Sequence, residues 1–281
     1  IWVGKFEASG TTDNYQIKPN QKSLTNIKLS IMFNTSRYVT TTKTSIYGTN
    51  SSTSDSHVMK NMEWGAVAYL TNSIYGRYTS TSTCIESGCE VWINNINTGY
   101  GMGTAVSGQP QWGPSITGCA GSSASAGVSN SQTACASGYD WKTKGVNAST
   151  TGNQYGIYDM SGGAWEYVMG VQKDASGNVQ VASSGFSKSS LPDSKYYDLY
   201  DYQAEDGVGY SRYHLGDATR EVLKNTSSKG DNAWWSDYSY NIYSSVPWGL
   251  FRRHFCCRRV LLSQCVRRDQ LQWFVPLHSY S

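Results

Sequence analysis

The chain has 281 residues and a formal net charge of +3, with 15% charged residues against 28 Gly, 21 Tyr and 10 Trp. So few charged residues exclude a long coiled coil or helical bundle, which would need many Glu and Lys. An aromatic content of 13% excludes a disordered chain, because aromatic side chains bury large apolar areas. The composition favours a folded, loop-rich protein with short strands.

The positive charge lies towards the C-terminal end of the chain. Residues 249–281 contain six Arg, no Lys and one acidic residue, which gives +5, whereas residues 1–248 carry −2. The overall basic charge is therefore no evidence for an anionic partner, and we expect no nucleic-acid ligand. Because no apolar run approaches about 18 residues, we also expect no transmembrane span in this chain.

Two N-terminal segments have patterns of regular structure. Residues 1–7 (IWVGKFE) alternate as in a strand, with Trp2, Gly4 and Phe6 on one face. Residues 31–38 carry a weak helical pattern. The sequence therefore predicts an opening strand followed by a short helix.

Residues 55–70 predict the clearest helix of the chain. Asp55 or Ser56 is suited to cap its first turn. Four apolar side chains recur at helical spacing, and we expect them to form its buried face: Val58, Met62, Ala66 and Tyr69.

Residues 79–155 are rich in Ser, Thr, Gly and Asn, yet they contain four cysteines. Cys84 and Cys89 lie in a Ser/Gly turn, and Cys119 and Cys135 bracket 15 residues of mostly Gly, Ala and Ser. A disulfide that closes a loop of this length stabilises a fold by roughly 3 kcal/mol in the chain-entropy model. We predict two local disulfides, which indicates export. A metal site is the alternative, although no Cys-x-x-Cys pair or neighbouring His completes four ligands.

The most specific stretch is residues 156–167 (GIYDMSGGAWEY), in which two adjacent glycines permit a tight turn. It resembles the G-L-Y-D-M-S-G-N-V-W-E-W signature of the formylglycine-generating-enzyme/sulfatase-modifying-factor family. Residues 2–7 (WVGKFE) resemble that family's opening strand, and residues 61–69 (NMEWGAVAY) resemble its helix T-E-A-E-W-E-Y-A-A. The matches occur in the family's order, cover about residues 1–170, and are closest to a non-catalytic subgroup of bacterial surface proteins.

This resemblance implies an α+β fold of the C-type-lectin-like, formylglycine-generating-enzyme-like type. Such a fold has short twisted antiparallel strands, two helices and long loops. We expect one domain over residues 1–248. Because the chain begins at Ile1 and not at Met, we expect either a removed leader or a truncated N-terminus.

The resemblance also implies a structural Ca²⁺ and no other cofactor. Its ligands would be the side chains of Asp159 and Glu166 and the carbonyls of Gly162 and Ala164. Hard oxygen ligands of this kind suit Ca²⁺. In the alternative interpretation, Asp159 caps the turn and Glu166 is a solvated or salt-bridged strand residue.

We expect a non-catalytic binding, adhesion or surface-display module, extracellular or at a bacterial cell surface, with an extracellular protein or glycan as its ligand. One alternative is a copper-dependent oxidoreductase of the formylglycine-generating type, using late cysteines. Cys256, Cys257 and Cys265 do not reproduce that family's spacing. The other alternative is a pilin-like structural subunit of the cell surface.

Residues 249–281 form an aberrant basic tail with only one of the 28 glycines, where the family has Gly-rich strands. A one-base shift of the reading frame from about Phe251, with permitted codons, gives a Gly-rich segment that ends in Ser-Phe-Arg. We interpret the tail as the product of a frameshift, which would remove the final strands and leave strand edges unpaired. A basic nucleic-acid arm and a membrane-surface segment are the competing interpretations.

Overall fold

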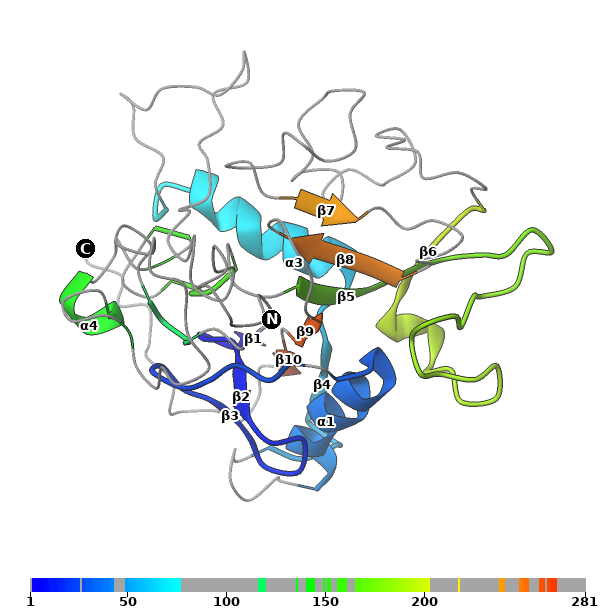
Figure 1. Cartoon of the computed structure of the whole chain (residues 1–281), viewed down its shortest axis with the longest axis horizontal. Coiled ribbons are helices and arrows are strands. Elements are labelled where there is room, and N and C mark those ends of the chain that lie inside the picture. The colour runs from blue at the N-terminus through cyan, green and yellow to red at the C-terminus, as the bar shows by residue number, and fades with distance from the viewer. Residues whose placement is uncertain are drawn as a thin grey trace, which may run out of the picture.

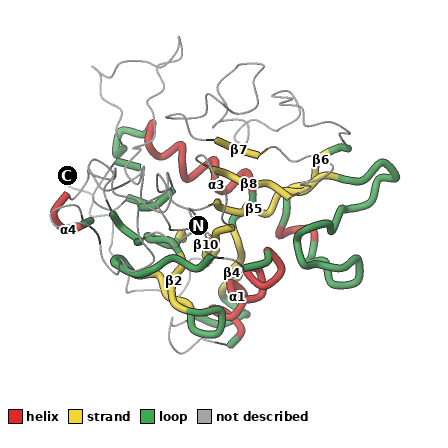
Figure 2. Tube along the Cα trace, viewed as in Figure 1, coloured by secondary structure: helices red, strands yellow, loops and turns green. Residues whose placement is uncertain are grey.

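The fold is given by a computed structural model. It describes residues 2–25, 27–42, 49–76, 116–119, 135, 140–144, 149, 151–152, 156–160, 165–202, 217, 238–240, 248–252, 258–260 and 262–266. In these residues short helices and short strands alternate with long loops (Figure 2). None of the helices in these ranges is long and apolar enough to cross a membrane.

One small sheet brings the N-terminal and C-terminal parts of the chain together. β10 (Leu262–Val266) lies between β1 (Trp2–Val3) and β4 (Ser54–Val58) and is antiparallel to both. A separate antiparallel pair consists of β2 (Ala8–Gly10) and β3 (Tyr15–Ile17).

The larger sheet is built around β5 (Trp165–Gln172). β6 (Asp198–Tyr200) and β9 (Arg258–Val260) pair with it in parallel, and β8 (Trp248–Arg252) pairs antiparallel. β7 (Tyr238–Tyr240) continues the sheet beyond β8. The apolar run from Tyr167 to Val171 is buried along β5, as expected for a strand that is covered on both faces.

Two core clusters lie on either side of β5. Helix α1 (Leu29–Thr41) packs against β4, and its buried apolar residues join Met169, Val171 and Trp248. On the other side, Val168 joins Trp64 and Val67 of helix α3 (Asn61–Ala68). Figure 1 shows α1 beside β4, with α3 and the β5–β8 pair further along the molecule. The remaining helical turns are η1 (Tyr69–Asn72), α4 (Trp141–Lys144) and η4 (Ser194–Tyr196).

The expected single strand over residues 1–7 is wrong. The strand stops after Val3 and resumes at Ala8, and Trp2 is 42% exposed while Phe6 is buried. Phe6 packs against Tyr158, with ring centroids 4.9 Å apart, and against Trp141 at 5.7 Å. The chain therefore leaves the extended path where Phe6 enters this aromatic cluster.

The helix expected over residues 55–70 is also shorter than predicted, since residues 54–58 form β4 and the helix begins at Asn61. Glu63 Oε2 accepts the backbone N–H of Lys60 at 2.9 Å and caps the first turn in place of Asp55 or Ser56. The predicted face is the wrong one: Met62 is 46% exposed and Tyr69 37%, because the core contacts come from Trp64, Val67 and Ala68.

The C-terminal tail contributes strands to both sheets. The boundary placed at residues 248 and 249 falls inside β8, and β9 and β10 lie entirely within the tail. We expected the tail to leave the chain without its final strands, whereas β10 pairs with β4 from Leu262 to Val266. Apolar residues such as Val260, Leu262 and Val266 give this segment the composition of a strand.

Candidate functional site

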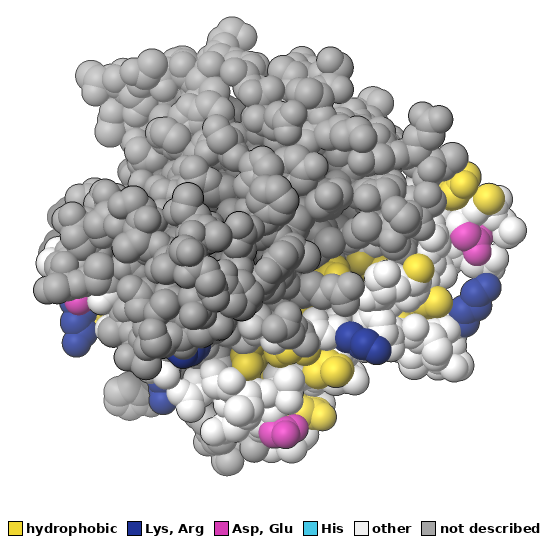
Figure 3. Space-filling model, in the orientation of Figure 1, with side chains coloured by type: hydrophobic (Ala, Val, Ile, Leu, Met, Phe, Trp, Pro, Cys, Tyr) yellow, Lys and Arg dark blue, Asp and Glu magenta, His cyan; other side chains and the backbone are white. Residues whose placement is uncertain are grey.

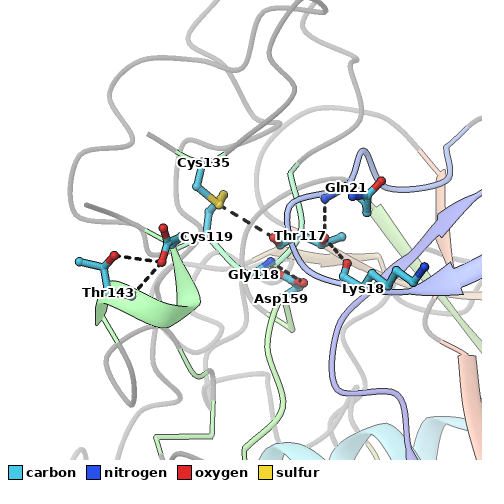
Figure 4. Close-up of a disulfide and its surroundings, with 9 residues drawn as sticks. Lys18, Gln21, Thr117, Gly118, Cys119, Cys135, Thr143 and Asp159 are labelled. Atoms are coloured by element: carbon cyan, nitrogen blue, oxygen red, sulfur yellow. Dashed lines mark hydrogen bonds between the residues drawn. A yellow bond between two sulfur atoms is a disulfide. The ribbon is translucent and has the colours of Figure 1, made fainter. Parts of the chain in front are cut away.

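Asp159 is the centre of a buried polar site (Figure 4). It is 1% exposed, and its backbone φ of 67° lies in the left-handed region, which Asp tolerates better than most residues. Its Oδ1 accepts the backbone N–H of Gly118 at 2.8 Å; Oδ2 accepts the same N–H at 3.0 Å and that of Glu7 at 3.3 Å. Burial and the charge of Asp159 raise the pKa of the neighbouring Tyr158. Asp159 thus ties the N-terminal strands and residues 116–119 to one turn.

Thr117 connects the same segment to residues 18–21. Its N–H donates to the Gln21 carbonyl at 2.9 Å, and its carbonyl accepts the N–H of Asn20 at 2.9 Å. Its hydroxyl donates to the Lys18 carbonyl at 2.6 Å and accepts the N–H of Gln21 at 3.1 Å. Residues 116–119 are therefore fixed on two sides, by Thr117 and by Asp159.

Gly118 occupies a position that requires glycine. Its φ is +75°, and a Cβ atom there would lie 3.0 Å from Cε1 of Phe6 and 3.2 Å from Cβ of Pro19. The Phe6 ring thus rests directly on the Gly118 backbone, next to the hydrogen bond to Asp159.

A disulfide joins Cys119 to Cys135, one of the two pairs expected from the sequence, with Cα atoms 5.4 Å apart. Cys119 is fully buried and Cys135 is half-buried. Cys119 also forms a β-bridge with Asp140, whose Oδ1 accepts the N–H of Thr143 at 2.8 Å in α4. The disulfide thus lies where residues 116–119 meet the start of α4. Cys84 and Cys89, the other expected pair, lie outside the described residues.

Of the four expected calcium ligands, the structure describes the side chain of Asp159 alone. Gly162 and Ala164 lie outside the described residues, and Glu166 is placed as a backbone position of β5. The observed contacts of Asp159 are with the backbone amides of Gly118 and Glu7, which lie in distant segments and not in the turn of Asp159 itself. Within the described ranges, no group of three or more His, Cys, Asp or Glu side chains is arranged to hold a metal ion. The calcium site therefore stays a prediction that rests on the family resemblance.

A second polar cluster joins β4 to α3. His57 is 6% exposed, and its Nε2 lies 3.0 and 3.1 Å from the two carboxylate oxygens of Glu63. Burial by itself would raise the pKa of Glu63, but the hydrogen bond and charge of His57, together with Lys60, outweigh it and hold this pKa below its usual value. The pair links the end of β4 to the first turn of α3, and nothing in the sequence pattern had indicated it.

The neighbouring Asp55 accepts hydrogen bonds from three side chains: Arg37, Lys195 at 2.8 Å and Tyr196 at 2.8 Å. These bonds outweigh the opposing effect of burial and lower the pKa of Asp55. The centroid of the Tyr196 ring lies 5.0 Å from the Arg37 guanidinium and 4.7 Å from the Lys195 ammonium. The cluster fastens α1 and β4 to η4.

Aspartates in the segment after β5 also have partners. Asp198 accepts the N–H of Met62 at 3.0 Å and lies 3.3 Å from the Lys60 ammonium, and Asp201 bonds to Lys173 at 3.0 Å. Tyr200 is buried and donates to Asp217 at 2.8 Å. Burial, followed by the charges of Asp217 and Asp198, raises the pKa of Tyr200. The Asp198 contacts thus join β6 to α3, whereas the Asp201–Lys173 pair is exposed at the surface.

The segment between β5 and β6, residues 173–197, projects from the body of the molecule as an arm of loops at the right of Figure 1. Its base is fixed, because the Trp248 indole donates to the Gln180 carbonyl at 3.1 Å and packs on Phe186 at 5.5 Å. The N–H of Ser30 in α1 also donates to the Ser184 carbonyl at 2.9 Å. The exposed side chains of the arm are mostly polar and include Ser176, Asn178, Ser183, Ser187, Lys188, Ser189, Ser190 and Ser194.

The late cysteines of the oxidoreductase alternative are placed only in part. Cys265 lies in β10 opposite Asp55 of β4, while Cys256 and Cys257 lie outside the described residues.

Comparison with known proteins gives no relative. No protein-family model matches the chain, and neither a curated protein nor a solved structure matches it.

Proposed function

We propose that the chain is a non-catalytic, extracellular binding module of a bacterial surface. Its fold would be of the C-type-lectin-like, formylglycine-generating-enzyme-like type, and the arm of residues 173–197 would form part of its ligand surface. The observation that carries this proposal is the combination in that arm of a fixed base and mostly polar exposed side chains.

Binding segments of this kind gain affinity from rigidity, because less conformational freedom is lost when the ligand binds. The packing of Phe186 on Trp248 and the bond from Ser30 to Ser184 provide that rigidity. Exposed Ser and Asn side chains form adaptable hydrogen bonds with polar ligands. This chemistry favours a glycan or a polar protein surface as the ligand.

One further observation supports the proposal: the Cys119–Cys135 disulfide suits an exported protein. On the face shown in Figure 3, the Lys and Arg side chains of the described residues lie at separate points.

The proposal is tested by screening the oxidised full chain against arrays of bacterial glycans and surface proteins. The variant Lys188→Ala/Ser189→Ala changes two exposed side chains of the arm, and Thr12→Ala/Lys18→Ala is the matched control on the β2–β3 hairpin. We expect the arm variant to weaken binding to the identified ligand by about tenfold, equivalent to 1.4 kcal/mol, and the control to leave it unchanged. Equal affinity of the unaltered chain, the arm variant and the control variant would exclude the arm from the ligand surface. Copper-dependent oxidation of a cysteine-containing peptide would favour the oxidoreductase alternative.

A further inference from the structure

The disulfide and the Asp159 site share one short segment. Gly118, which donates to both oxygens of Asp159, directly precedes Cys119, and Thr117 holds residues 18–21 by the four bonds described above. Sγ of Cys135 also lies 3.9 Å from the Thr117 carbonyl oxygen. The covalent link and the polar contacts therefore restrain the same four residues, 116–119 (Figure 4).

We propose that the Cys119–Cys135 disulfide is a redox-sensitive latch for residues 116–119. When the disulfide is closed, it holds the Gly118 N–H against Asp159 and Thr117 against residues 18–21. When it is reduced, this segment separates from Asp159, and the packing of Phe6 on Gly118 is lost with it. The latch is independent of what the chain binds.

The chemistry of opening is thiol–disulfide exchange with a dithiol reductant. Cys135 is the more exposed partner, so a thiolate of the reductant attacks its Sγ and the Sγ–Sγ bond breaks. Cys119 leaves as a thiolate and takes up a proton. The second thiol of the reductant then closes a cyclic disulfide and releases Cys135 as a thiol, so that two electrons and two hydrogens pass to the protein.

The opening is expected to be local for a physical reason. Cys119 and Cys135 bracket 15 residues, so reduction restores the freedom of a loop of that length and acts on its two ends. The aromatic cluster of Phe6 and Tyr158 and the buried cluster that contains Leu29 of α1 and Val58 of β4 share no buried residue, although Ile17 packs against both. The amides of α1 and β4 therefore serve as an internal reference.

The test is amide hydrogen exchange of the full chain, oxidised and treated with dithiothreitol. On reduction we expect exchange at Gly118, Glu7 and Asn20 to accelerate on the order of a hundredfold, with much smaller changes in β4. Unchanged exchange at these three amides would overturn the latch. Equal acceleration in β4 would also overturn it, because the disulfide would then contribute only to global stability.

Variants separate this disulfide from the other cysteines. In Cys84→Ser/Cys89→Ser the effect of the reductant should persist, whereas Cys119→Ser/Cys135→Ser should exchange rapidly at Gly118 without reductant. If Cys119→Ser/Cys135→Ser does not fold, reduction of Cys84→Ser/Cys89→Ser still decides whether the Cys119–Cys135 disulfide controls exchange at Gly118. In Asp159→Ala, which removes the acceptor of the Gly118 N–H, exchange at Gly118 should already be fast in the oxidised chain, and reduction should add less than it does in the unaltered chain. If reduction accelerates exchange at Gly118 equally in the variant and in the unaltered chain, the latch is contradicted.

Discussion

The carboxylate of Asp159 holds the backbone N–H of Gly118 through both of its oxygens, at 2.8 and 3.0 Å, across 41 positions of sequence. Because Oδ2 also accepts the N–H of Glu7, one buried side chain satisfies amides from two distant segments. Asp159 makes these contacts from a backbone φ of 67°, in the left-handed region that Asp tolerates better than most residues. The backbone conformation at Asp159 and its carboxylate therefore belong to the same set of contacts.

Asp159→Ala should be strongly destabilising. It leaves the two amides buried without their acceptor and removes the residue type best suited to the left-handed backbone, for a combined loss of about 3 kcal/mol. Asp159→Asn keeps an acceptor oxygen and the backbone preference, so its loss should be about half as large. Urea denaturation of both variants measures the difference in the free energy of unfolding. Equal losses would show that neither the acceptor oxygen nor the backbone preference retained by Asn contributes to stability.

Gly118→Ala tests the contact with Phe6. The new methyl group would lie 3.0 Å from the Phe6 ring and the backbone would keep a φ of +75°, so we expect a loss of about 2–3 kcal/mol. Gly177→Ala is the control, because its φ is +85° but no atom lies within 4 Å of the added Cβ. That variant should lose only about 1 kcal/mol of folding free energy. If the two losses are equal, Phe6 does not pack on Gly118.

Stability should decrease in acid through Glu63. Its pKa is lower in the folded protein than its usual 4.5, so the ionised form stabilises the fold. This contribution is fully present above about pH 5 and is lost as the pH falls through the folded-state pKa of Glu63. Glu63→Gln should be less stable than the unaltered chain at pH 7, and the difference should shrink towards pH 3. Urea midpoints between pH 3 and pH 7 measure it, and a constant difference would exclude this titration.

The sequence indicated the Cys119–Cys135 pair, because the cysteine spacing is a local signal. For Asp159 it predicted a calcium ligand or a turn cap, and neither prediction includes the contacts that the structure shows. It could not indicate Gly118 or Glu7 as partners of Asp159, since these contacts join distant segments. The buried face of α3 was predicted wrongly for the same reason, because it depends on contacts with a distant segment. Met62 fits the helical spacing as well as Trp64 does, and only the packing of Trp64 against Val168 of β5 decides between them.

The C-terminal tail places two consecutive arginines beside the central strand of the larger sheet. The observed register places Arg258 opposite Trp165 and Arg259 opposite Glu166, beside the central strand β5. Arginine has a lower strand preference than the β-branched and aromatic residues that are enriched in strands. If the tail results from a frameshift, the Gly-rich segment encoded in the shifted frame should suit this position better.

Two chains should be compared that share residues 1–250 and differ in the tail that follows. We expect the chain with the shifted-frame tail to give the higher soluble yield and a free energy of unfolding larger by about 2 kcal/mol, because several strand positions change together. Soluble expression and urea denaturation provide the two measurements. The frameshift interpretation predicts in addition a single-base insertion or deletion in the coding DNA near the Trp248 codon. An intact reading frame there, with the present tail giving the more stable chain, would exclude the frameshift.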